Sequence, residues 1–478
     1  MAKYECDVCG YIFDEEKEGK RWDELPYDWK CPVCDSDKSY FKIIRQDIKI
    51  ATPQGEIEVE VKDKIGGEYL SEWKRSSDDF ESYMADIHRI AETGKSITEP
   101  MRTRKPIISW EDVLIKGAQL AKLPLEKDAV INTQTIIGPK AKIPLVLETP
   151  VYISHMSFGA LSKEVKIAMA KGSAKVKTAM CSGEGGILPE ELENAYKYIF
   201  EYVPNEYSFN EENLKAVDAI EIKIGQATKP GMGGHLPWEK VTDEIASIRG
   251  KKVNEDIHSP AFFKDIRNKE ELKQKVDWLR EKSGGKPIGV KIAAGNIEDD
   301  LEVILFAQPD FITIDGRGGA TGSSPKAIKD ATSIPTLFAL YRARQFLDNK
   351  GAKEITLVIT GGLRMSSDFA KALALGADAI AIATSAMIAA GCQQYRVCNT
   401  GKCPVGIATQ NPALRKRLKI DVSAKRVENF LKVSTQELED FARITGNDNV
   451  HGLSLNDLCT SNSEISDNTK IEHIGGKK

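Results

Sequence analysis

The sequence predicts an α/β protein whose larger part is a (β/α)8 TIM barrel, joined to a small N-terminal metal-binding domain. Two observations predict the barrel: seven short apolar segments recur after residue 145, and helical stretches lie between most of them. A third observation predicts the small domain, because two C-x2-C pairs fall within the first 34 residues. A chain of 478 residues is long enough for both parts.

Composition excludes several classes of protein. The 67 basic and 71 acidic residues give a net charge of −4, which argues against nucleic-acid binding through bulk charge. The sequence contains no apolar run long enough for a transmembrane helix, and its start, MAKYECDVCGY, lacks the apolar core of a signal peptide. We therefore expect a cytoplasmic protein with reduced thiols, in which the seven clustered cysteines are metal ligands and Cys181 and Cys459 stand alone.

Composition and patterning also predict the order of the parts. The segment 45–65 alternates apolar and polar residues like a hairpin with Gly55 near its turn, and 68–95 contains helical stretches. The tail beyond Ser461 is polar and is expected to be mobile. The predicted divisions are a metal domain over 1–44, a linker and packing segment over 45–110, the barrel over 111–460 with a cysteine segment at 392–403, and the tail over 461–478.

The predicted barrel strands are apolar on both faces, as in a parallel sheet covered on both sides. An eighth, weaker strand is expected at KVNEDIHSP (252–260). The seven clear ones are TPVYISHMSFG (149–159), KTAMCSGEGG (177–186), AVDAIEIKIG (216–225), PIGVKIAAG (287–295), PDFITIDGRGG (309–319), ITLVITGG (355–362) and ADAIAIAT (377–384).

The loops after the last two strands are TGGLR (360–364) and ATSAM (383–387). In barrels of this class these loops commonly hold phosphate. The amides of Gly361 and Gly362 can face an anion, although the two glycines can also serve only to make tight turns.

The first metal site consists of two cysteine pairs separated by a gap that suits zinc or iron equally. Its ligands are Cys6, Cys9, Cys31 and Cys34. The surrounding CDVCGYIFD, WDELPYDWKCPVC and following Phe41 resemble rubredoxin, which implies one iron that carries one electron. The resemblance assigns the shielding of the iron to Tyr11, Phe13, Trp29 and Phe41.

Two features depart from the common rubredoxins. The segment between the cysteine pairs is shorter, and Asp35 replaces the usual glycine after the last cysteine. We therefore expect one turn that directs an amide at sulfur to differ. Zinc stays open as an alternative from the spacing alone.

The second cluster is C-x5-C-x4-C followed by Pro404, with Cys392, Cys398 and Cys403 as ligands. Three thiols and a proline fit an iron–sulfur cluster better than zinc. The segment resembles the [3Fe-4S] segment of the glutamate synthase family, and the resemblance runs from about 104 to 460. Further landmarks in the same order are SHMSFGALS, SGEGG, EIKIGQATKPGMGGHLPWEKV, VKI, DGRGGATGSSP and ITGGLR. The short form resembles the archaeal-type FMN-dependent enzymes, and a [4Fe-4S] cluster stays open.

The resemblance implies an oxidoreductase acting on CH-NH2 donors. Reduced FMN would give hydride to 2-iminoglutarate, made from 2-oxoglutarate and ammonia, to form L-glutamate. The chain begins Met-Ala instead of with a nucleophilic cysteine, so ammonia is expected to come free or from a separate glutaminase subunit. It has no G-x-G-x-x-G fingerprint, so electrons are expected from a donor protein or an NAD(P)H-oxidising subunit through the rubredoxin iron and the cluster.

The resemblance also assigns residues. For FMN it implies the loops at Met156, Ser157, Ser182 and Gly183, the third strand at Lys223 and Gln226, the fifth strand at Lys291, the loop at Gly318 and Gly319, and a phosphate site at Gly361, Gly362, Ala383 and Thr384. Lys291 lies inside an apolar strand and would stabilise the anionic reduced flavin. For the substrate it implies Lys229 and Arg249 as carboxylate ligands, with His235 in the substrate loop.

Met232 and His235 occupy positions where the well-known bacterial enzymes carry glutamate and glutamine. These departures keep open another FMN-dependent oxidoreductase acting on a 2-oxo or 2-hydroxy acid. An electron-transfer protein without substrate chemistry is a further alternative. The nitrogen source, the electron donor and the oligomeric state are not determined by the sequence.

Overall fold

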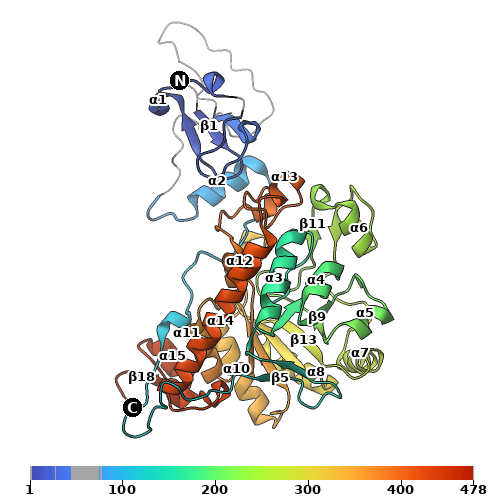
Figure 1. The fold of residues 1–478 in the computed structure, drawn as a ribbon, viewed down its shortest axis with the longest axis vertical. Coiled ribbons are helices and arrows are strands. Elements are labelled where there is room, and N and C mark those ends of the chain that lie inside the picture. The colour runs from blue at the N-terminus through green and yellow to red at the C-terminus, as the bar shows by residue number, and fades with distance from the viewer. Residues whose placement is uncertain (1–2, 27, 45–74, 76–77, 477–478) are drawn as a thin grey trace. The chain divides into compact units, whose positions relative to one another are not determined.

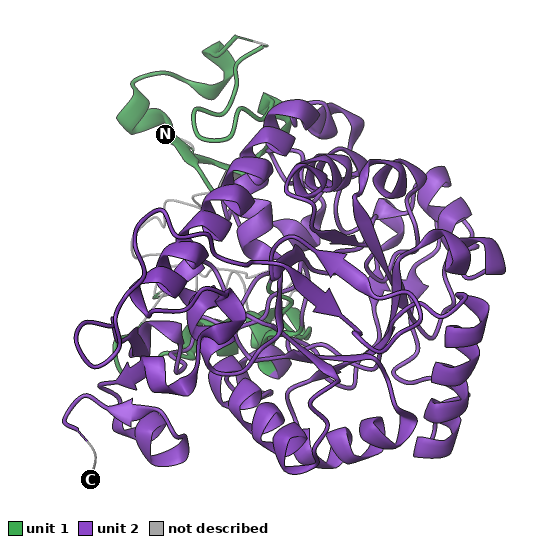
Figure 2. Cartoon of the chain, turned by 60° about the horizontal axis from the view of Figure 1, so that its bottom comes forward, with its two compact units in different colours: residues 1–99, 325–327 green, residues 100–324, 328–478 purple. Residues whose placement is uncertain are grey.

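The computed structural model describes residues 3–26, 28–44, 75 and 78–476. They fall into two compact units, one of residues 1–99 with 325–327 and one of residues 100–324 with 328–478 (Figure 2). The hairpin predicted at 45–65 lies outside the described residues. Within the described residues, no helix is long and apolar enough to cross a membrane.

The first unit contains a small antiparallel sheet with the strand order β2-β1-β3. The elements are β1 (Lys3–Cys6), β2 (Ile12–Asp14), α1 (Glu15–Glu18) and β3 (Phe41–Ile44), with the later helix α2 (Met84–Thr93) in the same unit.

The second unit is the predicted barrel. Eight strands form one sheet in the order β7-β16-β15-β14-β13-β10-β9-β8, and the hydrogen-bonded neighbours in it are parallel. The first and last strands of this order, β7 and β8, lie beside each other, so the barrel is nearly closed. Helices ring the strands (Figures 1 and 2). The strands are β7 (Val151–Ile153), β8 (Ala179–Cys181), β9 (Lys197–Tyr202), β10 (Ala219–Lys223), β13 (Ile288–Ala293), β14 (Phe311–Asp315), β15 (Thr356–Thr360) and β16 (Ala379–Ile382).

The prediction of the eighth strand at 252–260 is wrong. The missing strand is β9, KYIFEY, which lies between β8 and β10. The segment 252–260 supplies only β12 (Ile257–His258), which pairs with β11 (His235–Leu236) outside the barrel. The reason is burial: five residues of β9 are buried, whereas KVNEDIHSP is too polar to be covered on both faces. Lys223 is therefore on the fourth strand, Gln226 follows that strand, and Lys291 remains on the fifth.

Strand alternation divides the buried side chains of the barrel into two sets. One set, which includes Tyr198, Phe200 and Ile222, packs against the helices. The other set fills the interior and includes Ile199, Phe311 and side chains of the hairpin β5–β6. That hairpin is β5 (Thr135–Ile137) and β6 (Leu145–Leu147). The lower interior is thus a packed apolar core, and space for chemistry remains only at the other end.

The helices that follow the strands cover the barrel, and four of them, α3, α5, α6 and α7, are capped by Ser, Thr or Asn side chains that accept hydrogen bonds from free backbone amides. They are α3 (Lys163–Lys175), α4 (Pro189–Asn194), α5 (Glu211–Ala216), α6 (Asp243–Arg249), α7 (Lys269–Lys282), α8 (Ile297–Ala307), α9 (Lys326–Ala331), α10 (Thr336–Asn349), α11 (Ser366–Ala374) and α12 (Thr384–Ala390).

The C-terminal region packs on this ring. The long helix α14 (Ile420–Ile444) runs along α3 and also contacts α11 and α12. The tail was expected to be mobile, and this expectation is wrong: Ile465 and Ile471 are buried, and β18 (Glu472–His473) pairs with β17 (Leu458–Thr460). The remaining elements are β4 (Val113–Ile115), α13 (Pro412–Arg415) and α15 (Ser463–Asn468).

Candidate active site

A large cavity lies at the carboxyl ends of the barrel strands. It holds about 1660 Å³ of space not filled by atoms, part of it open to solvent. All eight strands are parallel, so the residues that follow them meet at one mouth. Most predicted site residues line this cavity: Met156, Ser157, Lys223, Gln226, Lys229, His235, Arg249, Lys291, Gly319, Gly361, Gly362, Ala383, Thr384, Cys392, Cys398 and Cys403.

Three predicted flavin residues lie behind the lining. Ser182 is fully buried, and its hydroxyl accepts from the amide of Glu201. A Cβ on Gly183 would lie 2.4 Å from the carbonyl carbon of Met156, and one on Gly318 would lie 2.5 Å from the oxygen of Gly361. These glycines let neighbouring loops lie against each other, and Gly183 also has a φ of +74°. They position the lining loops without lining the cavity themselves.

A buried lysine fixes two of the lining loops. Lys166, on α3, donates to the carbonyls of Met156, Cys181 and Ser182. Its ammonium also lies 2.8 Å from a carboxylate oxygen of Glu191, and both side chains are fully buried. This cation therefore ties the loop after β7 to the loop after β8, and the sequence analysis did not select it.

Beneath the cavity lies a layer of buried charges that point into the barrel. Glu201 on β9 and Glu221 on β10 are direct neighbours in the sheet and are only 2% and 1% exposed. The Lys291 ammonium lies 3.4 Å from a carboxylate oxygen of Glu201. Burial opposes the charge on Lys291, but Glu201 and Glu221 outweigh it and raise the pKa of this lysine above its usual range. Lys291 is therefore a fixed cation at neutral pH.

His155 contacts the same layer. Its Nε2 lies 3.0 Å from Glu221, and its Nδ1 lies 3.2 Å from the amide nitrogen of Gly183, which donates to it. Burial favours the neutral form of Glu201, but His155 and Lys291 hold the pKa of that carboxyl below its ordinary value. One lysine and one histidine thus lie against the two buried carboxylates.

Sequence reasoning missed His155, Glu201, Glu221 and Asp315 as site residues. The carboxylates could have been predicted in the same way as Lys291, because each is a charged residue inside an otherwise apolar strand. In KYIFEY and AIEIK the acidic residue has the same inward parity as Lys291 in IGVKIA. Burial raises the pKa of the third, Asp315 at the end of β14.

A second group of charges lies at the loop after β10. Glu184 contacts Lys223, with 2.5 Å between carboxylate oxygen and ammonium, and it accepts from the hydroxyl of Ser259. Although burial favours the neutral acid, Lys223 and Lys229 lower the pKa of Glu184. Burial, followed by repulsion from Lys223, lowers the pKa of Lys229 to about 8.

Arg249, at the end of α6, is 8% exposed and lines the cavity. Its Nη2 donates to the carbonyl of Phe158, and its guanidinium lies over the ring of Tyr207. Within the described residues, its buried Nε has no hydrogen-bond partner. A Cβ on Gly185 would lie 2.9 Å from Nη2, so this glycine of the SGEGG motif leaves space for the guanidinium. An anion in the cavity would satisfy an unpaired cationic donor of this kind.

His235 and Met232 lie nearer the surface. His235 is exposed, and its Nε2 lies 2.9 Å from Asp256. Met232 is 45% exposed and borders a smaller pocket beside the main cavity. The two departures from the bacterial pattern therefore lie at the rim of the cavity.

The cysteines of the second cluster, Cys392, Cys398 and Cys403, meet at the cavity. Cys403 is buried, and burial raises the pKa of Cys398 to about 12 in the absence of a metal. The three Sγ atoms of this trio do not all lie within 4.8 Å of one another, unlike the ligand atoms of the metal-ligand groups found among the described residues. A single zinc would hold its sulfurs closer than that, because the Zn–S bond is only about 2.3 Å. The wider spacing suits a multi-iron cluster, and Lys240 supports the site by donating to the carbonyl of Cys398.

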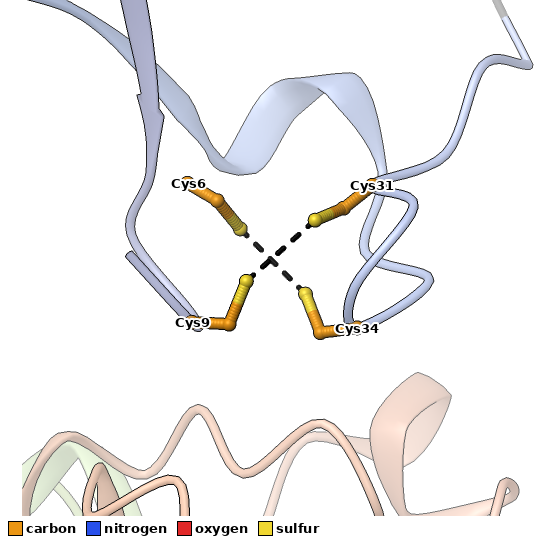
Figure 3. Close-up of side chains that lie close together, drawn as sticks. All are labelled: Cys6, Cys9, Cys31 and Cys34. Carbon is orange, nitrogen blue, oxygen red and sulfur yellow. Dashed lines mark hydrogen bonds between the residues drawn. The ribbon is translucent and has the colours of Figure 1, made fainter. Parts of the chain in front are cut away.

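The four N-terminal cysteines converge on one point (Figure 3). The Sγ atoms of Cys6 and Cys34 are 3.6 Å apart, as are those of Cys9 and Cys31, which is the separation expected around one tetrahedral ion. The predicted aromatics pack near the site, with Trp29 against Phe13 and Phe41. Tyr4 and Trp22, which stack at 4.3 Å, extend this cluster beyond the prediction.

The turn at Asp35 does not differ as expected. Asp35 has a φ of +57°, close to the +75° of Gly10, and each donates its amide to the first cysteine of its pair. The amides of Tyr11 and Ser36 bond the sulfurs of Cys9 and Cys34 in the same way. Aspartate tolerates the left-handed conformation, so the second turn keeps the geometry of the first.

A barrel with clustered cations and three thiols at one mouth, in one chain with a four-cysteine domain, has the groups of a metal-dependent oxidoreductase. Residues 85–448 match the conserved region in glutamate synthase, and residues 3–41 match rubredoxin. The chain belongs to the glutamate synthase family and carries a rubredoxin domain with a four-cysteine iron site.

Three relatives illustrate the match. The chain is 34% identical over 422 residues to a glutamate synthase large subunit-like protein of Rhizobium meliloti, covering 84% of this chain and 96% of that one. It is 42% identical to the archaeal glutamate synthase [NADPH] of Methanocaldococcus jannaschii, covering 68% and 63% of the two chains. The protein of the same name from Archaeoglobus fulgidus is 32% identical, covering 92% and 87%.

Among solved structures, a chimera of (S)-mandelate dehydrogenase overlaps with a TM-score of 0.49 at 16% identity, covering 73% of this chain and 88% of that one. The barrel itself is defined by the strand pairing of this chain.

Proposed function

We propose that this protein is an FMN-dependent glutamate synthase that forms L-glutamate from 2-oxoglutarate and ammonia through 2-iminoglutarate. The observation that carries the proposal is one cavity lined by Lys229 and Arg249 on one side and by the three cluster cysteines on another. Relatives named archaeal glutamate synthase [NADPH] support the same activity.

The cavity fits a flavin mononucleotide on chemical grounds. Gly361 and Gly362, with φ values of +106° and +97°, follow β15 and leave backbone exposed to the cavity, and the buried Thr384 offers a hydroxyl after β16. These groups would hold the phosphate, and Lys291 would supply a fixed positive charge near the N1–O2 edge of the flavin. When bound, the flavin would supply hydride after collecting single electrons.

The residues of the substrate loop would bind the two carboxylates. Arg249 offers its unpaired Nε. Lys229 donates one of its three N–H groups to the carbonyl of Gly233, which leaves the others for a carboxylate. Holding both carboxylates fixes the carbon to be reduced and limits its exposure to water. The rubredoxin iron and the cluster cysteines would bring electrons from a separate donor, and ammonia would arrive free or from a glutaminase subunit.

The direct test is anaerobic turnover with a chemically reduced donor, 2-oxoglutarate and either ammonium or glutamine. We expect glutamate with ammonium and none when 2-oxoglutarate is omitted. Absence of glutamate with every donor would contradict the proposal. Flavin spectral shifts with other 2-oxo or 2-hydroxy acids, but none with 2-oxoglutarate, would instead support the alternative oxidoreductase suggested by Met232 and His235.

The pKa of Lys229 predicts the pH dependence of substrate binding. Below about pH 8 the ammonium is charged and binds carboxylate, and above it the amine is neutral. Between pH 7 and 9 the charged fraction falls about tenfold, so the KM for 2-oxoglutarate should rise by about that factor while kcat changes less. Steady-state kinetics of Lys229→Arg provide the control, because arginine stays charged and should flatten the profile. Identical profiles for both proteins would contradict the role of Lys229.

A further inference from the structure

Two histidines and one aspartate form a group at the cavity rim that the glutamate synthase chemistry does not use. They are His235 on β11, His258 on β12, and Asp256 just before β12. Their ligand atoms all lie within 4.8 Å of one another, and all three residues are exposed. A ligand in solution can therefore reach them.

The pairing of β11 with β12 positions the two imidazoles. His235 lies directly opposite His258 in this ladder, and the rings stack with centroids 4.5 Å apart and planes within 4°. The Nε2 atoms lie 2.9 Å and 3.8 Å from the same oxygen, Oδ2 of Asp256.

One of these separations matches that of a coordinated metal, and the other is longer. With metal–ligand bonds of about 2.0 to 2.2 Å, a nitrogen and an oxygen ligand are about 3.4 Å apart at a tetrahedral angle and about 2.9 Å apart at a right angle. The 2.9 Å separation at His235 falls in this range, and the 3.8 Å separation at His258 exceeds it. The exposed His258 ring would therefore turn out of the stack to bring all three ligands to one ion. The other carboxylate oxygen of Asp256 accepts from the amide of Trp238 at 2.9 Å, which holds the carboxylate in place.

The chain around the group is tightly packed. A Cβ on Gly233 would lie 1.8 Å from the carbonyl oxygen of Ser259, and one on Gly234 would lie 2.3 Å from Glu184. The residues just before β11 therefore pack without space for side chains, Gly233 against the residue after β12 and Gly234 against Glu184 in the loop after β8. These contacts help to position the backbone that carries the imidazoles.

We propose that His235, Asp256 and His258 bind a divalent transition-metal ion such as Zn²⁺, Co²⁺ or Ni²⁺. Two imidazoles and one carboxylate suit these ions, and the exposed side of the site leaves coordination positions for water. His235 also lines the cavity, and Ser259, next to His258, donates to Glu184 in the loop after β8. The ion would therefore clamp the β11–β12 pair at the cavity rim. The inference rests on these side chains alone and does not depend on the proposed function.

The test uses the iron-loaded holoprotein, titrated with Zn²⁺ against a chromogenic chelator while the iron absorbance is monitored for displacement. We expect one saturable equivalent whose affinity falls about tenfold or more in His258→Gln and in Asp256→Asn. His473→Gln is the matched control, because this histidine lies on β18 outside the group, and it should leave the affinity unchanged. Titration with Co²⁺ should give visible ligand-field bands without intense thiolate charge transfer.

Equal affinity in all four proteins, or no saturable binding, would overturn the proposal. In that case His235 and Asp256 form only the hydrogen bond seen in the structure. Because turnover is measured separately, this result would leave the glutamate synthase assignment intact.

Discussion

Replacing Lys291 with methionine is expected to cost about 3 to 5 kcal/mol of unfolding free energy, the largest effect of any single change proposed for the barrel. Lys291 is 5% exposed and lies close to two buried carboxylates that are direct neighbours in the sheet. Without its ammonium, Glu201 and Glu221 repel each other more strongly inside the barrel, because the lysine that contacts Glu201 is lost. Urea denaturation followed by far-UV circular dichroism measures the loss.

The matched control for this prediction is Lys273→Met. Lys273 forms an exposed ion pair with Asp277 on α7, and such pairs contribute about 0 to 1 kcal/mol. The double variant Lys291→Met/Glu201→Gln should recover part of the loss, since it removes one of the uncompensated charges. If Lys291→Met and Lys273→Met were equally stable, the electrostatic account of the barrel interior would be wrong.

The same substitution should impair the flavin site. A fixed cation close to the flavin would favour its anionic reduced form, so Lys291→Met protein that still folds should have a lower flavin reduction potential. Spectroelectrochemical titration of folded protein reports this separately from stability. An unchanged potential would show that Lys291 serves only to balance Glu201 and Glu221.

Replacing Cys398 with serine is expected to remove the iron–sulfur cluster and reduce glutamate formation at least about 100-fold. Hard hydroxyl oxygen is a poor ligand for a cluster that prefers soft thiolates, and the cluster would be the route by which electrons reach the cavity. Cys398 lines that cavity together with Cys392 and Cys403. Iron and sulfide analysis with EPR spectroscopy measures cluster loss, and the rubredoxin absorbance should persist because its four cysteines are unaltered.

Cys459→Ser is the control for that prediction. Cys459 lies on β17, partly exposed, and it belongs to neither group of cysteines. Its replacement should change neither iron content nor turnover. Full cluster content in Cys398→Ser, or equal losses in both variants, would remove Cys398 from the ligand set.

Periodicity located seven of the eight barrel strands because each is a run of buried apolar residues. Periodicity does not identify β9, where Lys197 and Glu201 interrupt the apolar run in KYIFEY. Glu201 of this strand points into the charged layer of the barrel. The residues that it contacts there, such as Lys291, come from other strands, so a local sequence pattern does not reveal them. The prediction of a mobile tail is wrong for a related reason, because Ile465 and Ile471 are buried in the main hydrophobic core.

The sequence alone determined the family, the two cysteine groups and most of the cavity lining, because short motifs carry ligands at fixed spacing along the chain. Only the tertiary structure decided which charges meet. Lys291 with Glu201, His155 with Glu221, Lys166 with Glu191, and His235 with His258 each join residues from different elements. Electrostatic energies depend on distance and burial, and both are set by folding and not by order along the chain.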